Sequence, residues 1–248
     1  MSAAYLLIAH GSRDRRSQEA FAALARQLTT RLSVMMSQSV LVGTAYLELS
    51  SQPLHQQIVQ FAHHAVAEST STELHLLPLF LLPGMHVRDD IPVEVTQART
   101  LLTIDCQLHL KNYLGAQAGF VPLLRRLLSR LPASQRILMA HGSRRFGGNA
   151  PIEAMAGRLQ ALPSYWAIAP TLSTQIKQLV SQGHQDIAIQ PYFLFPGGIT
   201  TAIADEVALL QQQFEETQLH LGYPLSEAPE FIALVLDWLL RGDGVGIE

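Results

Sequence analysis

Short apolar runs alternate with longer amphipathic stretches along the chain, and this alternation predicts its secondary structure. Runs rich in Leu, Ile and Val are typical of buried strands, whereas apolar residues that recur every three or four positions indicate helices. The predicted strands lie near 5–9, 40–47, 73–82, 105–110, 136–140, 164–168, 186–194 and 218–221. The predicted helices lie near 17–36, 52–68, 92–102, 117–131, 149–161, 173–182, 200–217 and 228–240. Alternation of strand and helix predicts an α/β fold with parallel sheets flanked by helices.

The chain is also built from two related halves. The tetrad His-Gly-Ser-Arg occurs twice, in LLIAHGSR ending at Arg13 and in ILMAHGSR ending at Arg144. A second related pair follows, with PLFLLPGMHVRDDIP starting at Pro78 and QPYFLFPGGITTAIADEV starting at Gln190. The polar turn LPASQR marks the boundary between the halves. We therefore predict two similar lobes by internal duplication, an N-terminal domain of residues 1–132 that carries the active site and a degenerate domain of residues 133–248.

Composition narrows the class of protein. The 248 residues are 48% hydrophobic, which is enough for one large core or two small ones. A formal net charge of −3 argues against a general nucleic-acid binder. Cys106 is the only cysteine, so an intrachain disulfide is excluded and a cysteine-held iron–sulfur cluster is disfavoured. No apolar stretch has the length of a membrane span or a signal peptide, and we expect a cytoplasmic protein without membrane partners.

The two halves differ at the positions that could carry chemistry. His10 follows the first predicted strand, Glu48 ends the second, and His86 follows the third in a loop. His141 matches His10 in the second half, but Ile199 stands opposite His86, and the segment SYWAIAPTL has no carboxylate to match Glu48. Ligands of parallel sheets bind at the carboxyl ends of the strands, so these side chains are expected at one rim. Imidazole suits divalent metals such as iron and cobalt, and a glutamate there could be a ligand, a base, or both.

Other polar residues have simpler interpretations. Ser12 is expected to cap the helix behind the first HGSR turn, and Asp89 and Asp90 the helix after His86. The first of these helix starts, with arginines beside it, would attract anionic groups. His141, without metal-ligating partners, is either a structural relic or a substrate contact. The histidines expected to be solvated are His55, His63, His64, His184 and His220.

Three of these segments resemble the motifs of a known enzyme family. AHGSR, the YLEL segment around Glu48 and PLFLLPGMHVRDDIP are similar to the sirohydrochlorin chelatases, class II tetrapyrrole chelatases, in their long two-repeat form. The resemblance implies insertion of Fe²⁺, or as second choice Co²⁺, into sirohydrochlorin for siroheme or cobalamin biosynthesis. It assigns catalysis and metal binding to His10, Glu48 and His86. The metal is then a substrate, and no tightly bound cofactor is expected.

Sirohydrochlorin is flat and rich in carboxylates, which points to further contacts. The expected substrate-binding residues are Ser12, Arg13, Met85, Arg88, His141, Ser143 and Arg144. The apolar residues expected to line a cleft are Phe80, Leu82, Phe195 and the pair Gly197–Gly198, together with Met85. Duplication within one chain could build the cleft that a shorter relative builds as a homodimer, so we expect a monomer with pseudo-dimeric halves.

The sequence bears on three alternative functions. A tetrapyrrole or metal carrier would use the same ligands without turnover, and the sequence leaves this possibility open. A histidine phosphatase is disfavoured because Ala9 and Ala140 occupy the place of the arginine that precedes the His-Gly pair in those enzymes. A dinucleotide-binding fold is disfavoured because no G-x-G-x-x-G follows a predicted strand. The metal itself stays unassigned, since the chain lacks the histidine-rich tract and cysteine cluster of some long relatives.

Overall fold

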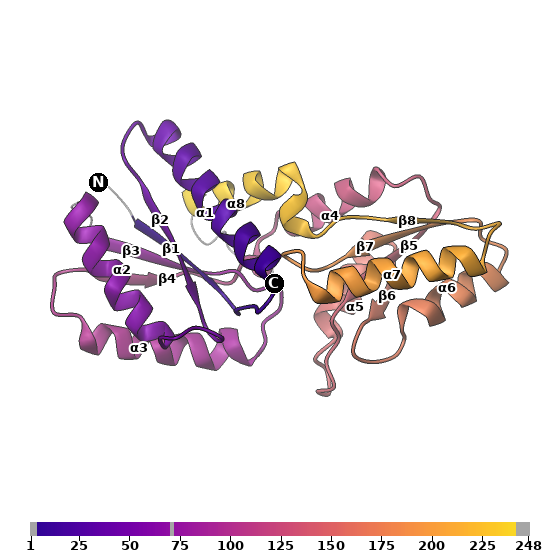
Figure 1. The fold of residues 1–248 in the computed structure, drawn as a ribbon, viewed down its shortest axis with the longest axis horizontal. Helices are drawn as coiled ribbons and strands as arrows, with labels where there is room; N and C mark the ends of the chain where they lie inside the picture. Colours follow the sequence, from indigo (N-terminus) through magenta and orange to yellow (C-terminus); the bar gives the residue numbers. More distant parts are fainter. Residues whose placement is uncertain (1–3, 70–71, 242–248) are drawn as a thin grey trace. The chain divides into compact units, whose positions relative to one another are not determined.

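A computed structural model describes residues 4–69 and 72–241, which form two four-stranded parallel sheets flanked by helices (Figure 1). The strands of the first sheet are β1 (Ala4–Ala9), β2 (Leu41–Tyr46), β3 (Glu73–Pro78) and β4 (Gln107–Leu110). Those of the second are β5 (Gln135–Ala140), β6 (Leu162–Tyr165), β7 (Asp186–Pro191) and β8 (Gln218–Leu221). The order is β2-β1-β3-β4 in one sheet and β6-β5-β7-β8 in the other, so the repeats share one topology. The predicted α/β fold with two similar parallel sheets is confirmed.

The helices of the first repeat cover both faces of its sheet. These helices are α1 (Arg15–Met36), α2 (Leu54–Ser69) and α3 (Ile91–Leu101), with a π-helical turn η1 (His86–Asp90) before α3. Alternate residues of β1, among them Leu6 and Ile8, pack into one core with α2 and α3. On α1, the apolar stripe that includes Phe21 and Leu28 is buried, and Phe21 lies edge-on to Tyr46 of β2. Both faces of the sheet are thus packed, as the near-continuous apolar strand sequences require.

The second repeat has the corresponding helices α5 (Ala150–Leu159), α6 (Leu172–Ser181) and α7 (Gly198–Gln213). The remaining elements are α4 (Phe120–Ser129), α8 (Pro229–Arg241) and two short 3₁₀ turns, η2 (Leu114–Ala116) and η3 (Leu225–Glu227). The core of this repeat includes Ile137, Ile176, Ile189 and Ile203. Its helices therefore bury the same kind of aliphatic face as those of the first repeat.

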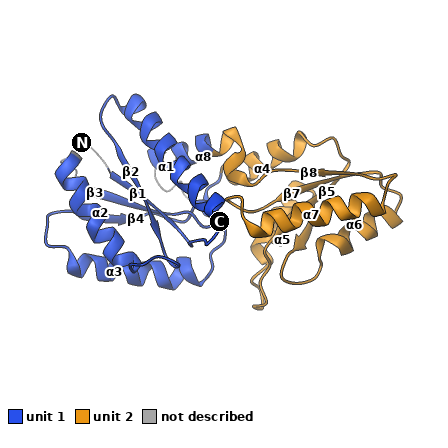
Figure 2. Cartoon of the chain, in the orientation of Figure 1, with its two compact units in different colours: residues 1–118, 232–248 blue, residues 119–231 orange. Residues whose placement is uncertain are grey.

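Two compact units divide the chain differently from the predicted halves (Figure 2). Unit 1 comprises residues 1–118 and 232–248, and unit 2 comprises residues 119–231. Helix α4, which precedes the repeat boundary at LPASQR, belongs to unit 2, where it contacts α5 and β7. Most of α8 is grouped with unit 1. The last helix of each repeat is thus grouped wholly (α4) or mostly (α8) with the other repeat, a division that hydrophobic periodicity does not encode.

In both repeats, a glutamate of the following helix accepts a hydrogen bond from the start of the second helix. The backbone N–H of His55, at the start of α2, donates to the Glu94 carboxylate at 2.7 Å, and the His55 ring contacts the same oxygen at 2.9 Å. In the second repeat, the backbone N–H of Ser173 donates to Glu206 at 3.2 Å. A carboxylate from the following helix therefore satisfies an orphan helix donor in both repeats. The expectation that His55 is solvated was wrong, because this contact holds it half-buried.

Three predicted strands extend too far. The predicted strands 73–82, 164–168 and 186–194 run past the observed ends of β3 at Pro78, β6 at Tyr165 and β7 at Pro191. Beyond each proline only one further N–H, of Leu79 or Tyr192, donates to the neighbouring strand. The chain then turns away, and Phe80 accepts a hydrogen bond from Gly115 after β4. These apolar residues are buried or partly buried outside the sheet, so an apolar run alone does not mark where the strand ends.

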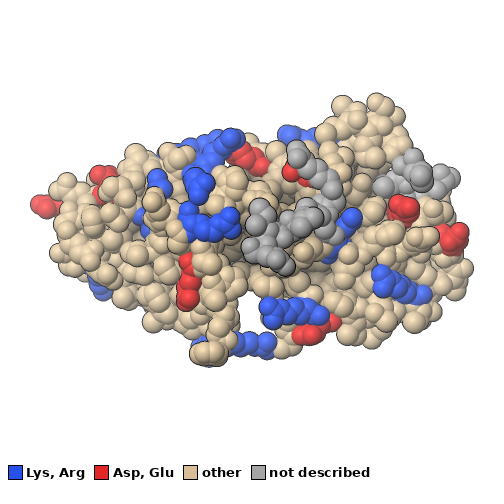
Figure 3. Space-filling view, turned by 180° about the vertical axis from the view of Figure 1, so that it is seen from behind, with Lys and Arg blue, Asp and Glu red and all other residues tan. Residues whose placement is uncertain are grey.

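Charged side chains are sparse on the surface that Figure 3 shows. Lys and Arg form small separate groups there, with a few Asp and Glu among them. Within residues 4–69 and 72–241, no helix combines the length and apolar character needed to cross a membrane.

Candidate metal site

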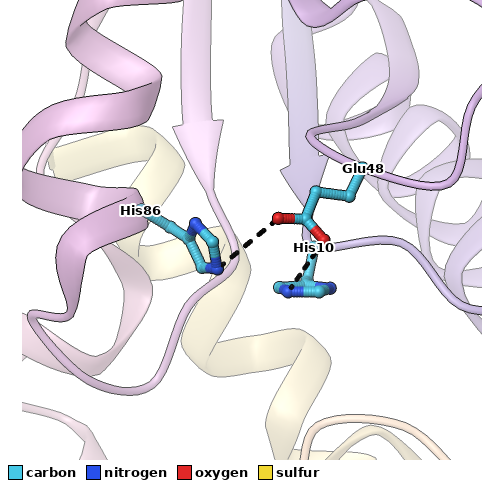
Figure 4. A group of neighbouring side chains, drawn as sticks. All are labelled: His10, Glu48 and His86. Carbon is cyan, nitrogen blue, oxygen red and sulfur yellow. Dashed lines mark ion pairs between the residues drawn. The ribbon is translucent and has the colours of Figure 1, made fainter.

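The strand order of unit 1 brings three sequence-predicted residues to one place. Strand β1 lies between β2 and β3, so the chain leaves β1 in one direction and later returns on its other side. Such a switch point opens a crevice at the carboxyl ends of the strands. His10 follows β1, Glu48 lies two residues beyond β2, and His86 begins the turn after β3. As predicted, the side chains of these residues lie close together at one rim of the sheet (Figure 4).

Backbone contacts fix the first two residues relative to each other. The N–H of Leu47 donates to Ala9 at 2.9 Å, and the N–H of Glu48 donates to His10 at 2.8 Å, which extends the β1–β2 ladder past the strand ends. Gly11 has φ +110°, and a Cβ placed there would lie 2.2 Å from the Glu48 backbone oxygen. Only glycine allows this close approach. The HGSR turn therefore packs directly against the backbone of Glu48.

The side chains face one another across a small gap. His10 Nε2 lies 3.7 Å from Glu48 Oε2, and His86 Nε2 lies 4.0 Å from Glu48 Oε1. The two imidazole rings are edge to face with centroids 4.9 Å apart, and the three ligand atoms lie within 4.8 Å of one another. Metal–ligand bonds of about 2.0–2.2 Å place neighbouring ligands roughly 3–4 Å apart, so small rotations would close this set around one ion. Two imidazoles and a carboxylate suit a borderline divalent metal.

His86 is oriented from behind by Asp90. Its Nδ1 lies 2.6 Å from Asp90 Oδ2, one turn further along η1. This contact assigns the Nδ1 proton to the Asp90 side and leaves Nε2 to face Glu48. The expectations of a loop at His86 and of a capping role for Asp90 were wrong. His86 belongs to a π-helical turn, closed by the Ile91 N–H to the His86 carbonyl, and Asp90 makes no side-chain cap. Such turns are frequent at functional sites.

The site is open to solvent on one side. The side chains of His10 and Glu48 are 50% and 51% exposed, and that of His86 is 33% exposed. Three protein ligands with an open face leave coordination positions for water or for a ligand that receives the metal. The arrangement can bind a divalent ion and also release it. Glu48, within reach of both imidazoles, can also accept protons from a ligand at the open face.

The predicted basic and hydroxyl residues of unit 1 divide into two groups. Asp14, not Ser12, caps α1: its carboxylate accepts from the Arg16 N–H at 3.0 Å, and the Ser12 hydroxyl accepts from the Asp14 N–H at 3.1 Å. Arg16 also donates to Asp14, which lowers the pKa of that carboxyl, and Arg15 pairs with Glu19. A carboxylate therefore already lies at this helix start, and Arg15 and Arg16 are both paired, so anion binding there stays a prediction that rests on Arg13.

Arg13 and Arg88 remain available for an anionic ligand. In the described part of the chain, neither has a carboxylate within 4.0 Å, and both are exposed. Arg88 lies in the same π-helical turn as His86. Burial raises the pKa of Tyr113, and the charge of Arg88 partly opposes this shift. Met85, immediately before His86, is 43% exposed. These three predicted substrate contacts thus lie within a few residues of a candidate metal ligand in sequence.

Unit 2 keeps the backbone of the site but only one of its three candidate ligands, since His141 matches His10. The N–H groups of Trp166 and Ala167 donate to Ala140 and His141, at 2.9 Å each, as Leu47 and Glu48 do in unit 1. Ala167 therefore occupies the place of Glu48. Helix α7 starts directly at Gly198, so the second repeat has no π-helical turn among its described elements. His141 is exposed, with its Nδ1 3.0 Å from the Gly142 carbonyl oxygen.

The loop after His141 is built differently from its counterpart in unit 1. Ser143 Oγ accepts from the Arg145 N–H at 3.2 Å, and the Ser143 backbone is held by both ends of the Asn149 amide at 2.8 and 2.9 Å. Arg144 is exposed beside it. The hydroxyls of Ser12 and Ser143 thus each have a role inside their loops. Contact of either serine with a substrate stays a prediction.

A partly buried imidazole elsewhere in unit 1 was not identified from the sequence. His75 on β3 lies between Tyr5 of β1, on which its ring stacks, and His109 of β4, to which it is tilted, with ring centroids 5.3 and 5.1 Å apart. Burial lowers the pKa of His75, and the charges of Lys111 and His109 lower it further. Strand register places these rings side by side, which only the paired sheet reveals. Among the other histidines, His63 and His64 are exposed as expected, and His220 contacts Asp186 at 3.2 Å.

Comparisons with known proteins agree with the two-repeat organisation. A protein-family model described as CbiX matches residues 4–131 and again residues 135–241. The chain is 22% identical over 223 residues to the sirohydrochlorin ferrochelatase of Bacillus subtilis (strain 168), covering 85% of this chain and 81% of that protein. It is 23% identical over 239 residues to the sirohydrochlorin cobaltochelatase of Priestia megaterium, covering 88% and 73%.

Solved structures share the fold. SirB from Bacillus subtilis with Fe³⁺ aligns with a TM-score of 0.73 at 20% identity, covering 97% of this chain and 95% of that one. CbiX, described as the terminal enzyme for siroheme biosynthesis in denitrifying bacteria, aligns with a TM-score of 0.65 at 19% identity, covering 96% and 98%. At these identities the alignments establish the two-lobed α/β fold.

Proposed function

Because the chain belongs to the CbiX family, we propose that it inserts a divalent metal ion into sirohydrochlorin. The family resemblance predicted from the AHGSR, YLEL and PLFLLPGMHVRDDIP segments is thereby confirmed. Relatives named as a ferrochelatase and as a cobaltochelatase support Fe²⁺ and Co²⁺ as the candidate metals. We keep Fe²⁺ as the first choice and Co²⁺ as the second.

The observation that carries the proposal is the convergence of His10, Glu48 and His86 at the ends of neighbouring strands. In the proposed mechanism, His10 and His86 hold the incoming ion through their Nε2 atoms. The open face of the site presents the ion to the macrocycle. Insertion replaces two pyrrole N–H protons by the divalent metal, and the protons leave to a base and then to water. Glu48 is placed between the imidazoles, where it can share the metal and accept a proton.

Substrate recognition is proposed to use residues around this centre and in the second repeat. Arg13 and Arg88 have the charge to bind peripheral carboxylates, and Met85 has the apolar surface to contact the ring. The proposed contacts from the second repeat are His141, Ser143 and Arg144, with Ser12 as the counterpart of Ser143 in the first. We further propose duplication units of residues 1–132 and 133–248, a monomeric chain and a cytoplasmic location. Sedimentation velocity at several protein concentrations tests the monomer.

The experiment mixes purified protein with sirohydrochlorin under anaerobic conditions and follows the absorption change after Fe²⁺, Co²⁺ or Ni²⁺ is added. The sharpest comparison is His10→Ala against His141→Ala, because the same residue is removed from the same HGSR turn in each repeat. Turnover that His10→Ala and His86→Ala abolish and His141→Ala largely spares supports a chelatase working from its first repeat. Equal losses from His10→Ala and His141→Ala would contradict the assignment of metal binding to unit 1.

The variant Glu48→Gln distinguishes a chelatase from a carrier that binds sirohydrochlorin without inserting metal. The amide keeps the size of the side chain and loses its charge and basicity, so we expect sirohydrochlorin binding to persist while insertion falls by about 10²–10⁴-fold. Tight binding by the unaltered protein with insertion no faster than the uncatalysed reaction would instead identify a carrier. No binding of sirohydrochlorin at all would refute the proposed function.

A further inference from the structure

Leu49, the residue after Glu48, has a backbone conformation that leucine normally avoids. Its φ is +57°, in the left-handed region. Within residues 4–69 and 72–241, only two other non-glycine residues have positive φ, Ser37 and Gln160. Both of these cap the C-termini of helices, α1 and α5, where the conformation is common and the cap N–H groups bond to helix carbonyls. Leu49 ends no helix, so its conformation has no such local explanation.

The folded protein gains little from the Leu49 side chain. A leucine in the left-handed region costs about 1–2 kcal/mol relative to its ordinary conformations. Core packing does not offset this cost, because Leu49 is 54% exposed. Glycine or asparagine would make the same turn with less strain. Strain of this kind at an exposed apolar residue is typical of a functional site.

The second repeat lacks both the strain and the exposure. Ile168 corresponds to Leu49, since it follows Ala167 as Leu49 follows Glu48 in the matched backbone ladders. Ile168 is half-buried and is absent from the positive-φ residues of the described chain. In each repeat the side chain at this position lies close to the HGSR glycine: Leu49 Cβ is 3.4 Å from a Cβ placed on Gly11, and Ile168 Cγ1 is 2.9 Å from one placed on Gly142. The strained conformation accompanies the metal-ligating carboxylate and is missing where that carboxylate is missing.

A second apolar side chain stands beside another candidate ligand. Met85 is 43% exposed and directly precedes His86, as Leu49 directly follows Glu48. Exposed apolar side chains next to exposed metal ligands suit a flat ligand whose apolar face must rest over the metal while its carboxylates stay in water. This inference rests on the proposed function. We infer that Leu49 is held in its strained conformation to contact the apolar face of the tetrapyrrole, and that it is a substrate-binding residue.

The test replaces Leu49 by Gly, Ala and Met and measures sirohydrochlorin binding without metal, by absorption or fluorescence titration. Burial of the exposed half of a leucine side chain corresponds to about a four- to tenfold change in Kd. We expect Leu49→Gly and Leu49→Ala to raise Kd and KM for sirohydrochlorin by that factor with kcat within twofold. Leu49→Met, which keeps an apolar side chain, should stay within twofold of the unaltered protein in Kd.

Thermal unfolding distinguishes a binding role of Leu49 from a structural one. A structural role predicts a lower Tm for Leu49→Gly, whereas a strained binding residue predicts a higher one. Leu49→Gly relieves the strain and should raise Tm by about 1–4 °C while it weakens binding. Gln160→Gly is the matched control, because Gln160 is exposed with φ +53° and caps α5 in unit 2. It should raise Tm similarly and leave Kd unchanged.

Two outcomes would overturn the inference, and a third concerns the proposed function. Unchanged Kd in Leu49→Gly and Leu49→Ala, with normal turnover by the unaltered protein, refutes the role of Leu49 and leaves the chelatase proposal standing. A lower Tm together with weaker binding in Leu49→Gly shows that Leu49 is structural. Failure of the unaltered protein to bind sirohydrochlorin overturns both proposals.

Discussion

Removing the Asp90 carboxylate should weaken metal binding while the fold stays intact. Asp90 Oδ2 lies 2.6 Å from His86 Nδ1, and the opposite ring nitrogen faces Glu48. Residues that orient a metal-ligating histidine in this way typically change metal affinity by about 10–100-fold when they are removed. We therefore expect Asp90→Ala to raise the Kd for Co²⁺ by that factor, which corresponds to about 1.4–2.7 kcal/mol.

The effect on stability should be much smaller. The side chains of His86 and Asp90 are 33% and 41% exposed, and exposed ion pairs contribute about 0–1 kcal/mol. A loss of that size lowers Tm by less than about 4 °C in a chain of this length. Asp90→Asn should lie between the two proteins in metal affinity, because its amide oxygen still accepts the Nδ1 proton but carries no charge.

The assay is a Co²⁺ titration without tetrapyrrole, followed by the KM for metal and the KM for sirohydrochlorin in the insertion reaction. Asp89→Ala is the control, since Asp89 is an exposed carboxylate in the same π-helical turn. A positioning role raises the Kd and KM for metal in Asp90→Ala alone and leaves the KM for sirohydrochlorin unchanged. If Asp90→Ala and Asp89→Ala bind Co²⁺ equally well, Asp90 does not orient His86.

Two further predictions concern unit 1. The pKa of His75 is lowered by burial and by the charges of Lys111 and His109, so its stabilising contribution is complete above its ordinary pKa near 6.5 and is lost as the pH falls below it. The Tm of His75→Phe should therefore fall less between pH 7.5 and pH about 5.5 than that of the unaltered protein, and equal falls would contradict this assignment. Gly11→Ala should destabilise the protein by more than about 1–3 kcal/mol in urea unfolding, because a Cβ there would lie 2.2 Å from a backbone oxygen in addition to the cost of φ +110°. Gly147→Ala, with φ +71° and no atom within 4 Å of the added Cβ, should show the conformational cost alone.

The three candidate metal ligands could be placed together from the sequence because their positions follow from strand order. His10, Glu48 and His86 each come just after an apolar run, and parallel strands bring such positions to one rim. The orienting role of Asp90 could not be predicted in the same way, because it depends on a π-helical turn. One signal was present: the spacing from Pro83 to the buried Ile91 is one residue longer than the spacing from Pro196 to the buried Ile203. An extra residue within a helical turn is what a π turn absorbs.

Other features depend on tertiary contacts that the local sequence does not contain. The tetrapeptide QLHL forms the last strand in both sheets, yet its histidine stacks on His75 in one repeat and contacts Asp186 in the other. The environment of this histidine therefore depends on the neighbouring strand and not on the tetrapeptide itself. The grouping of α4 with unit 2 and of residues 232–241 with unit 1 is equally invisible to hydrophobic periodicity, which reports that a helix face is buried but not which sheet buries it.

The two repeats show that the backbone of the site is maintained separately from its ligands. Unit 2 retains a glycine with φ +82° in its HGSR turn, the N–H of Ala167 bonded to His141, and the helix-capping Glu206. The bonds to His141 and Glu206 satisfy backbone N–H groups, and the glycine allows the positive φ of the turn, so these features serve the fold in both repeats. The carboxylate and the second histidine stabilise neither sheet. Under the proposed function they are needed only where the metal binds, and a reaction that ends with transfer of the metal is slowed by ligands that hold it as tightly before transfer as during it. On that proposal, one repeat with three exchangeable ligands meets the chemical requirement, while the other is free to keep only the architecture.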